Sequence, residues 1–484
     1  MWNFIKDHIW ELLIAVHYIL AIVAIVMILL KNINPTKTLS YILVLAMFPG
    51  LGLVVYYFFG QDYRMFRMFK KRALLNQTNV QKWTDKLELL EDKAYDLSSK
   101  TLDGNTKIIK LIDEQRYSPV TLYNQAEILV NGEVKFKRLF EDIQNATSSI
   151  HMEYFIIQDD QIGSELIELL CTKSQQGVGV KVNYDAVGSS IGRKTLSRLK
   201  KAGVEIYPFM PIYFPKFASK INYRNHRKIV VIDGVIGYVG GINIADEYVN
   251  SVNRRYWRDT HLRIHGQAAG MLQLYFLLDW NFVTDQNVEV EAKWFPKSGQ
   301  TNQLPIQIIS SGPDMKWSNI MEAMFTAINS ARSYVYLTTP YFIPNEEISL
   351  AMITAAKSGV DVRLLIPKTC DSRIAKYATY SYLAILLKAG VKIYFYEKGN
   401  IHAKTIVADD VFSTIGTANM DNRSFHLNFE VNAMLYDADT AIQMRDLFMK
   451  DVEDSSPIDA ARWENRGVSQ RLFESLCRLW APLL

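Results

Sequence analysis

Two long apolar runs near the start of the chain dominate its hydrophobic pattern. Residues 9–30 and 39–59 are almost wholly apolar, and only the short stretch 31–38 separates them. Each run has the ~20 residues that an α-helix needs to cross a bilayer. A cleaved signal peptide would have a shorter apolar core and would leave the second run unexplained. A buried soluble hairpin would carry more polar positions. The pattern therefore predicts a membrane-spanning helical hairpin.

The basic residues around this hairpin predict its orientation. Five lysines and arginines lie between residues 64 and 72, after the second run, whereas the loop between the runs holds only Lys31 and Lys37. The positive-inside rule then places both termini, and the large remainder of the chain, in the cytoplasm. The same basic cluster would also suit anionic headgroups. A topology signal alone explains it equally well, so both interpretations stay open.

Beyond a charged, helical linker expected over residues 63–115, short apolar strands alternate with amphipathic helices. Three segments recur: 149–156 resembles 333–343, 176–182 resembles 358–364, and 201–207 resembles 388–394. Alternation of this kind predicts a mostly parallel sheet covered by helices. We therefore expect a membrane hairpin over 1–62 and two α/β lobes, 116–295 and 296–484, related by an approximate twofold axis.

The repeat is imperfect in one loop and carries an amphipathic tail. The first half has 11 extra residues around 210–220, a mixture of aromatic and basic side chains. This loop is either a contact with acyl chains and headgroups or a packed surface excursion. The C-terminal segment 471–484 docks either on the protein core or on the bilayer, and we favour the core.

Composition narrows the classes of partner. The formal net charge is only +4, so bulk electrostatics does not suggest a nucleic-acid partner. The three cysteines are far apart in the sequence and form no CxxC pair, which argues against a zinc site. Their odd, sparse number fits a reducing compartment.

One short pattern occurs once in each half. His226-x-Lys228-x-x-x-x-Asp233 and His402-x-Lys404-x-x-x-x-Asp409 have the same spacing. Six residues after each aspartate, a turn of small residues leads to an asparagine: Asn243 after Gly-Gly-Ile, and Asn419 after Gly-Thr-Ala. A single copy is compatible with chance. Two matched copies on a repeat predict the two halves of one bipartite active site.

The residue types suit chemistry at a phosphodiester. A histidine and a lysine two positions apart in a strand project from the same face, so an imidazole and a fixed cation would meet one phosphate. Asn243 and Asn419 are candidate phosphate-binding donors beside glycines that permit close approach. The six motif residues form the catalytic set. Within it, Asp233 and Asp409 lie an odd seven positions from their histidines, so we expect them to be mainly structural.

Two histidines permit a division of labour. One attacks phosphorus and forms a phosphohistidine ester, while the other donates a proton to the leaving alcohol and later accepts one from the incoming alcohol. We expect no metal or cofactor, because the two lysines supply the positive charge. Asp259 and Glu430 are candidates to orient the histidines through Nδ1. The alternative for each is a structural ion pair on a strand.

These residues resemble the phospholipase D superfamily, and most closely the bacterial cardiolipin synthases. The amino-acid sequence around the motifs also resembles that family: Asn-Tyr-Arg-Asn-His over 222–226, Thr-Pro-Tyr-Phe-Ile-Pro over 339–344 and Asn-Met-Asp-Asn-Arg-Ser over 419–424. The membrane hairpin also matches. The resemblance implies an α/β fold of two repeated lobes, each a mixed sheet flanked by helices, with pseudo-twofold symmetry. One position departs slightly, because Thr417 stands where serine is common.

The resemblance also implies an activity and its location. Cardiolipin synthases condense two phosphatidylglycerols into cardiolipin and glycerol, so the expected partners are phosphatidylglycerol and anionic membrane lipids, with no nucleic acid. By analogy His226 is the nucleophile and His402 the general acid and base. We expect a cell-membrane protein with two spans and a cytoplasmic catalytic domain. Its oligomeric state stays open.

Three alternatives use the same residues differently. A membrane-tethered phospholipase D would hydrolyse phospholipid to phosphatidic acid. A superfamily nuclease would cut nucleic acid, although the hairpin and the modest charge argue against it. A membrane scaffold with relic motifs would have no activity.

Overall fold

The structure, a computed structural model, describes residues 8–30, 35–48, 52–53, 91–113, 118–210, 223–252, 255–286, 288, 292–370 and 372–481. Contacts divide the chain into two units, which we describe separately. The smaller comprises residues 1–71 with 213–221, and the larger contains the remainder. The basic cluster at 64–72 and the loop expected at 210–220, apart from Met210, lie outside the described residues.

The N-terminal unit contains helices α2 (Ile9–Leu30) and α3 (Pro35–Met47). Within the described residues, α2 is the one helix long and apolar enough to cross a membrane. Ala24 and Ile28 of α2 pack with Leu45 of α3, while most other apolar side chains of α2 are exposed. The second predicted span is only partly described, because α3 ends at Met47 and, of the residues beyond 48, only 52 and 53 are described before residue 91.

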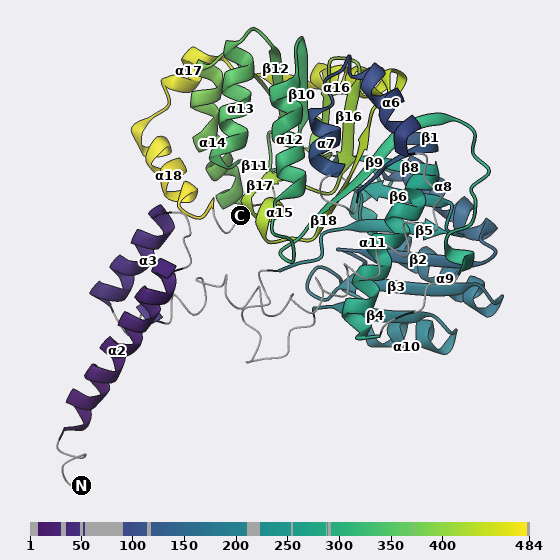
Figure 1. The fold of residues 1–484 in the computed structure, drawn as a ribbon, viewed down its shortest axis with the longest axis horizontal. Helices are drawn as coiled ribbons and strands as arrows, with labels where there is room; N and C mark the ends of the chain where they lie inside the picture. Colours follow the sequence, from purple (N-terminus) through teal and green to yellow (C-terminus); the bar gives the residue numbers. More distant parts are fainter. Residues whose placement is uncertain are drawn as a thin grey trace. The chain divides into compact units, whose positions relative to one another are not determined.

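The larger unit is built on one continuous sheet of 15 strands (Figure 1). The first lobe follows two short helices, α6 (Glu91–Thr101) and α7 (Lys107–Asp113). Its elements are β1 (Val120–Val130), α8 (Asn131–Asn145), β2 (Ser149–Tyr154), α9 (Gln161–Gln175), β3 (Gly179–Asp185), α10 (Arg193–Lys201), β4 (Glu205–Phe209), β5 (Lys228–Ile232), β6 (Ile236–Gly240), β7 (Tyr256–Arg258), β8 (Thr260–Gly266) and α11 (Gln267–Thr284).

The second lobe repeats this order and adds helices at its end. Its elements are β9 (Gln303–Ser311), α12 (Asn319–Ser330), β10 (Tyr334–Thr338), β11 (Phe342–Ile343), α13 (Glu346–Lys357), β12 (Asp361–Pro367), α14 (Arg373–Lys388), β13 (Lys392–Tyr396), β14 (Gly399–Ile401), β15 (Thr405–Ala408), β16 (Phe412–Gly416), β17 (Met420–Asp421), α15 (Asn422–His426), β18 (Glu430–Leu435), α16 (Ala438–Glu453), β19 (Ser455–Pro457), α17 (Ala460–Glu464) and α18 (Val468–Arg478).

The strand order confirms two related lobes. From the centre outwards, the first lobe runs β1-β8-β6-β5-β2-β3-β4 and the second runs β9-β18-β16-β15-β10-β12-β13, with β19 added at the edge. Strands β1 and β9 pair antiparallel and join the halves. The pseudo-twofold arrangement of two mixed-sheet lobes is therefore as expected.

The expectation of a mostly parallel sheet is wrong. Within the 15-stranded sheet, parallel pairing is confined to the outer strands, β2-β3-β4 and β10-β12-β13, where helices connect successive strands. The motif strands β5 and β15 instead each form an antiparallel hairpin with the next strand, β6 or β16. Hairpins need no helical crossover, so the βα alternation describes only the first part of each repeat.

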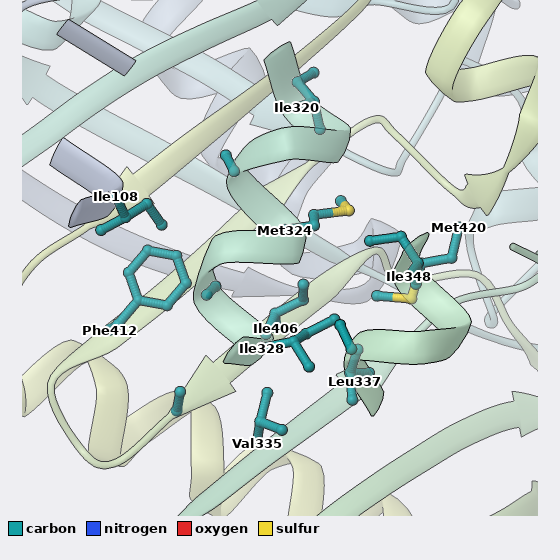
Figure 2. Packing of buried hydrophobic residues seen from close by; sticks show 14 of the residues in the cluster. Ile108, Ile320, Met324, Ile328, Val335, Leu337, Ile348, Ile406, Phe412 and Met420 are labelled. Atoms are coloured by element: carbon teal, nitrogen blue, oxygen red, sulfur yellow. The ribbon is translucent and has the colours of Figure 1, made fainter. Parts of the chain in front are cut away.

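Buried apolar side chains fill both lobes and their junction. Helix α11, buried along most of its length, packs with strands of both lobes in one cluster. In the second lobe, α12 contributes Ile320, Met324 and Ile328 to a core that also takes up Ile108 of α7 (Figure 2). Helices α6 and α7 thus pack into this core although they fall within the segment expected to be a linker.

The motif aspartates hold the start of a neighbouring strand in both lobes. Asp233 accepts hydrogen bonds from the backbone N–H groups of residues 147–149 at 2.7–2.9 Å, and Asp409 accepts the same three from residues 332–334 at 2.7–2.9 Å. Both follow the motif strand with positive φ, +51° and +54°, a conformation that Asp tolerates better than most residues. The odd spacing from the histidine therefore reflects a turn at the far end of the strand.

We expect Asp233→Asn to lower stability without lowering activity. The amide has one acceptor oxygen instead of two, so the free energy of unfolding should fall by about 1–3 kcal/mol, measured by thermal or denaturant unfolding. Turnover per folded molecule should stay within about twofold of wild type, since the carboxylate lies a five-residue strand, ~16 Å, from the histidine.

Asp103→Asn is the matched control, because Asp103 also has a positive φ of 49° but a side chain that is 87% exposed. It should change stability little. A loss of turnover for Asp233→Asn as large as that of a histidine variant would instead assign Asp233 to the chemistry.

Candidate active site

The two motif histidines are held by the backbone of the opposite lobe. His226 N–H donates to the carbonyl oxygen of Phe429 at 3.0 Å, and His402 N–H donates to that of Arg258 at 2.7 Å. Strand β14, just before His402, pairs with β7 of the first lobe, and Asn225 forms an isolated bridge with Phe429. The backbone of each motif histidine is thus hydrogen-bonded to the residue that precedes the candidate carboxylate of the other lobe.

Side-chain hydrogen bonds complete this exchange between lobes. Nδ1 of His226 lies 2.9 Å from a carboxylate oxygen of Glu430, and Nδ1 of His402 lies 2.8 Å from Asp259. Both carboxylates are fully buried, while each histidine side chain keeps 11% exposure. Because Nδ1 is engaged, Nε2 is the ring nitrogen left for a substrate in both histidines.

The two lysines lie beside their own histidines and within the field of the opposite motif. Lys228 Nζ donates to the carbonyl oxygen of His226 at 2.8 Å, and Lys404 Nζ donates to that of His402. The charge of Lys404 acts on His226, and the charge of Lys228 acts on His402. Burial lowers the pKa of Lys228 to about 7. The motifs therefore face each other across one cationic site.

Burial keeps both imidazoles neutral in the absence of an anion. It lowers the pKa of His226 well below its usual value, with Lys228 and Lys404 adding to the effect. Burial and Lys404 lower the pKa of His402 to about 4, against the opposing hydrogen bond with Asp259. An anionic phosphodiester would reverse the charge balance and favour protonation.

The two carboxylates differ in electrostatics although their positions are equivalent. Burial raises the pKa of Glu430 to about 7, against the opposing charge of Lys228. Burial acts in the same direction on Asp259, but the hydrogen bond with His402 and the charges of His402 and Lys404 lower the pKa of Asp259 to about 2. His402 therefore has a fully ionised partner, and His226 has one that is readily protonated.

The small residues after each motif are explained by the carboxylates. A Cβ added to Gly241 would lie 2.1 Å from an oxygen of Asp259, so this position has no room for a side chain. At the equivalent position, the Thr417 hydroxyl donates to Glu430. We expected the glycines to permit close backbone approach, and here the chain passes directly beside the carboxylate that orients a histidine.

Both asparagines are buried, and the side chain of Asn243 already has hydrogen-bond partners. Asn243 accepts from Ile156 N–H at 3.2 Å and donates to the Tyr248 hydroxyl at 2.7 Å. The Asn419 backbone N–H donates to Ser424 at 3.2 Å. Phosphate binding by their amides stays a prediction. In the described part of the chain, no three metal-ligating side chains converge.

Several residues around the site were not anticipated. Aromatic rings flank the histidines, with Phe155 5.0 Å from His226 and Trp257 5.2 Å from His402, centroid to centroid. Arg227 is fully buried, pairs with Asp279 of α11 and donates to the Glu430 carbonyl oxygen at 3.2 Å. Trp257 stands two residues before Asp259, and Arg227 lies inside the first motif, so proximity to the motifs was the available signal.

The remaining histidines are not part of the reacting pair. His151 is a core residue, stacked on Phe276 and 2.9 Å from Gln273. His261 is buried behind Asp259 and 3.4 Å from Ile242 N–H. His426 is exposed and lies 3.0 Å from Ser318.

The raised pKa of Glu430 predicts a pH-dependent stability. Between the usual value of 4.5 and about 7, the folded state keeps a proton that the unfolded state releases, so stability falls as pH rises through this window. We expect Glu430→Gln to remove this slope. Relative to wild type, the variant should gain up to about 3 kcal/mol in unfolding free energy from pH 4 to pH 8.

The control is Glu168→Gln on α9, an exposed glutamate whose replacement should give the wild-type slope. Parallel pH curves for wild type and Glu430→Gln would show that folding does not raise the pKa of Glu430 and would contradict this assignment.

Comparisons with known proteins agree with this geometry. A family model described as "Cardiolipin synthase, PLD-like domain" matches residues 139–266 and 324–452, and "Phospholipase_D-nuclease N-terminal" matches residues 19–61. Cardiolipin synthase 2 of Bacillus anthracis is 42% identical over 94% of this chain and 88% of its own. Cardiolipin synthase of Geobacillus sp. (strain WCH70) is 42% identical over 94% of this chain and 90% of its own.

A solved structure supports the fold alone. The phosphatidylserine synthase of Haemophilus influenzae Rd KW20 superposes with a TM-score of 0.59 over 78% of this chain and 100% of its own, at 14% identity. Together with the family match and the identity to the two synthases, the paired histidine motifs lead to one conclusion: the chain belongs to the cardiolipin synthase family of phospholipase D-like proteins.

Proposed function

We propose that this protein condenses two phosphatidylglycerol molecules into cardiolipin and glycerol through a phosphatidyl-histidine intermediate. The observation that carries the proposal is the pair of histidines, each bonded through Nδ1 to a buried carboxylate of the other lobe. Relatives named cardiolipin synthase, 42% identical over 94% of the chain, specify the phosphodiester as a phospholipid.

In the first half-reaction, His226 is the nucleophile. Its Nε2 attacks phosphorus of the donor lipid, the N–P bond forms, and the P–O bond to glycerol breaks. His402 gives its Nε2 proton to the departing glycerol oxygen. The electrostatics support this division, because the ionised Asp259 stabilises a protonated His402, whereas the readily protonated Glu430 supports a neutral His226.

In the second half-reaction, the roles of bond making and breaking reverse. His402, now neutral, takes the proton from the terminal hydroxyl of a second phosphatidylglycerol. The resulting oxygen attacks phosphorus, the N–P bond breaks, and cardiolipin forms while His226 is regenerated. Glycerol attacking in place of the lipid would return phosphatidylglycerol, so the transfer is reversible.

Positive charge in the site stabilises the phosphorane-like transition states. Lys228 and Lys404 would turn from the histidine carbonyls to the non-bridging oxygens. Asn243 and Asn419 would contribute amide donors on exchange of their present partners. Asp233 and Asp409 act only by holding the backbone.

We also propose a location for this reaction. Helix α2 and the apolar run 39–59 would form two membrane spans, and the basic residues that follow would keep the catalytic lobes on the cytoplasmic side. Such an anchor keeps the site at the surface where phosphatidylglycerol and other anionic lipids are found.

The direct test is purified full-length protein given phosphatidylglycerol alone. We expect equal amounts of cardiolipin and glycerol, and a loss of at least ~10³-fold in rate for both His226→Ala and His402→Ala. Lipid products are separated by mass spectrometry and glycerol is measured enzymatically. Lys137→Met, an exposed surface change, serves as control and should retain full activity.

Phosphatidic acid in place of cardiolipin would contradict the transfer reaction and favour a phospholipase D. Full cardiolipin production by His226→Ala would contradict the assignment of the site.

A further inference from the structure

The C-terminal helix α18 has one face docked on the second lobe. Cys477 and, just beyond the helix, Ala481 are buried and pack beside Ile343. Glu474, also buried, pairs with Arg466 at 2.7 Å. These residues recur every three or four positions, so they form one side of the helix. Docking on the core is therefore as expected.

The opposite face of α18 is apolar and exposed. Leu472, Leu476, Leu479 and Trp480 are 61%, 51%, 75% and 56% exposed. Leu472, Leu476 and Leu479 recur at spacings of four and three residues, so they lie together on the side opposite the docked residues. Leu479 and Trp480 directly follow the end of α18 at Arg478. If the exposed face of a docked helix lay in water, it would carry polar residues. Contiguous exposed apolar patches instead mark interaction surfaces.

Basic residues line one border of this face. Arg471 and Arg478 are both exposed and lie seven positions apart, so they share one side of the helix, between the docked face and the apolar face. Arg478 also lies 4.5 Å from the ring centroid of Tyr382. A tryptophan beside leucines, with arginines at the rim, is the composition of helices that lie in a membrane interface. The rim charges match an anionic lipid surface.

We propose that α18 is an interfacial helix whose exposed apolar face lies in the anionic bilayer that holds the substrate. The inference rests on the proposed function in one respect, since the bilayer is taken to be anionic because the proposed substrate is phosphatidylglycerol. The helix would hold the second lobe at the membrane, in addition to the N-terminal anchor.

The test is nitroxide accessibility in full-length protein reconstituted into phosphatidylglycerol–phosphatidylcholine vesicles. With Cys370→Ser as background, labels are placed at Leu476→Cys and, as control, at Lys357→Cys on exposed α13. We expect the label at 476 to be relaxed more by oxygen than by a water-soluble nickel chelate, and the label at 357 to show the reverse.

Three outcomes would overturn the proposal. Equal access of the chelate to both labels would show that the face is in water. Spin–spin broadening at 476 would identify a second copy as its occupant. Exclusion of both reagents would show that another part of the protein covers it. None of these depends on activity, so they are distinct from failure of the proposed function.

A separate observation concerns Lys135 on α8. Its side chain is fully buried, and its Nζ has no hydrogen-bond partner among the described residues. The ammonium position lies 3.9 Å from the ring centroid of Phe136 and 5.0 Å from that of Tyr154. Burying an amine without a partner is costly.

Packing alone does not need this lysine. The equivalent aspartate clamps align Ser149 with Tyr334, a displacement of 185 residues that pairs Lys135 with Ile320. Ile320 lies in the apolar core of the second lobe (Figure 2). An apolar side chain therefore satisfies the same helix position in the other half.

Helix α8, which carries Lys135, is hydrogen-bonded at its first residue to the backbone of Asp259. Asn131, one helical turn earlier, donates its N–H to the Asp259 carbonyl oxygen at 2.9 Å and accepts from Asp259 N–H at 3.1 Å. Burial lowers the pKa of Lys135 well below its usual value, and the charge of Asp259 opposes that shift. Asp259 in turn orients His402.

We infer that Lys135 is a positioning residue that moderates the pull of Asp259 on His402 and so sets the acidity of His402. The inference rests on the proposed role of His402. The positive charge of Lys135 offsets part of the negative charge of Asp259. Removing the lysine should therefore strengthen the electrostatic stabilisation of the His402 imidazolium by Asp259. The other titratable or charged groups around this pair are Lys404, Lys228, His261, Tyr248 and Arg258.

The test compares Lys135→Met with Lys137→Met, which removes an exposed lysine two residues away. For Lys135→Met we expect the alkaline limb of the kcat–pH profile to move upward by about half a unit or more and kcat at neutral pH to fall. We expect the melting temperature to be unchanged or higher, because an unpartnered buried amine is replaced by an apolar group. Lys137→Met should match wild type throughout.

An unmoved or lowered alkaline limb overturns the inference, whatever the melting temperature. The same shift in Lys137→Met overturns it as well, because it would reflect general charge. Wild-type protein that forms no cardiolipin would overturn the proposed function and this inference together.

Discussion

Each catalytic histidine candidate depends on a carboxylate from the other lobe. The His226–Glu430 and His402–Asp259 hydrogen bonds cross the junction in both directions, supported by backbone bonds at Phe429 and Arg258. The antiparallel pairing of β1 with β9 sets the distance over which this exchange is made. A single lobe would contain a histidine without its orienting group, so the site exists only when both lobes are folded and joined.

The repeat gives two similar halves, and the chemistry needs them to differ. Symmetry supplies a histidine, a lysine and a carboxylate twice, yet one carboxylate is ionised and the other is readily protonated. Thr417 donates to Glu430 where Gly241 merely leaves room for Asp259. In the proposed reaction, such local departures from symmetry would favour one imidazole as the nucleophile and the other as the acid.

Much of this arrangement could be predicted from the sequence because it is encoded in local spacing. The matched motifs and the two lobes follow from residue types that recur at fixed distances. The candidate carboxylates were predicted only as acidic residues downstream of each motif, because Asp259 lies 33 residues after His226 and Glu430 lies 28 after His402. The antiparallel direction of the central strands could not be predicted, because strands joined by hairpins and strands joined by helical crossovers have similar apolar runs in the sequence. The partner of Gly241 did not follow either, because this glycine approaches Asp259, a residue 18 positions away that no local pattern connects with it.

Contacts between lobes are the part that sequence spacing cannot supply. Arg227 and Lys135 look like surface charges in the sequence, yet both are fully buried. Their neighbours, Asp279, Glu430 and Asp259, come from other elements, so burial becomes visible only when the chain is folded.

Trapping the covalent intermediate tests the central claim most directly. Full-length wild-type protein, incubated briefly with phosphatidylglycerol and quenched under conditions that preserve phosphohistidine, would be digested and mapped by mass spectrometry, beside His226→Ala. A phosphatidyl group on His226 is the predicted result. A phosphatidyl group on His402 in the wild-type protein would contradict the account.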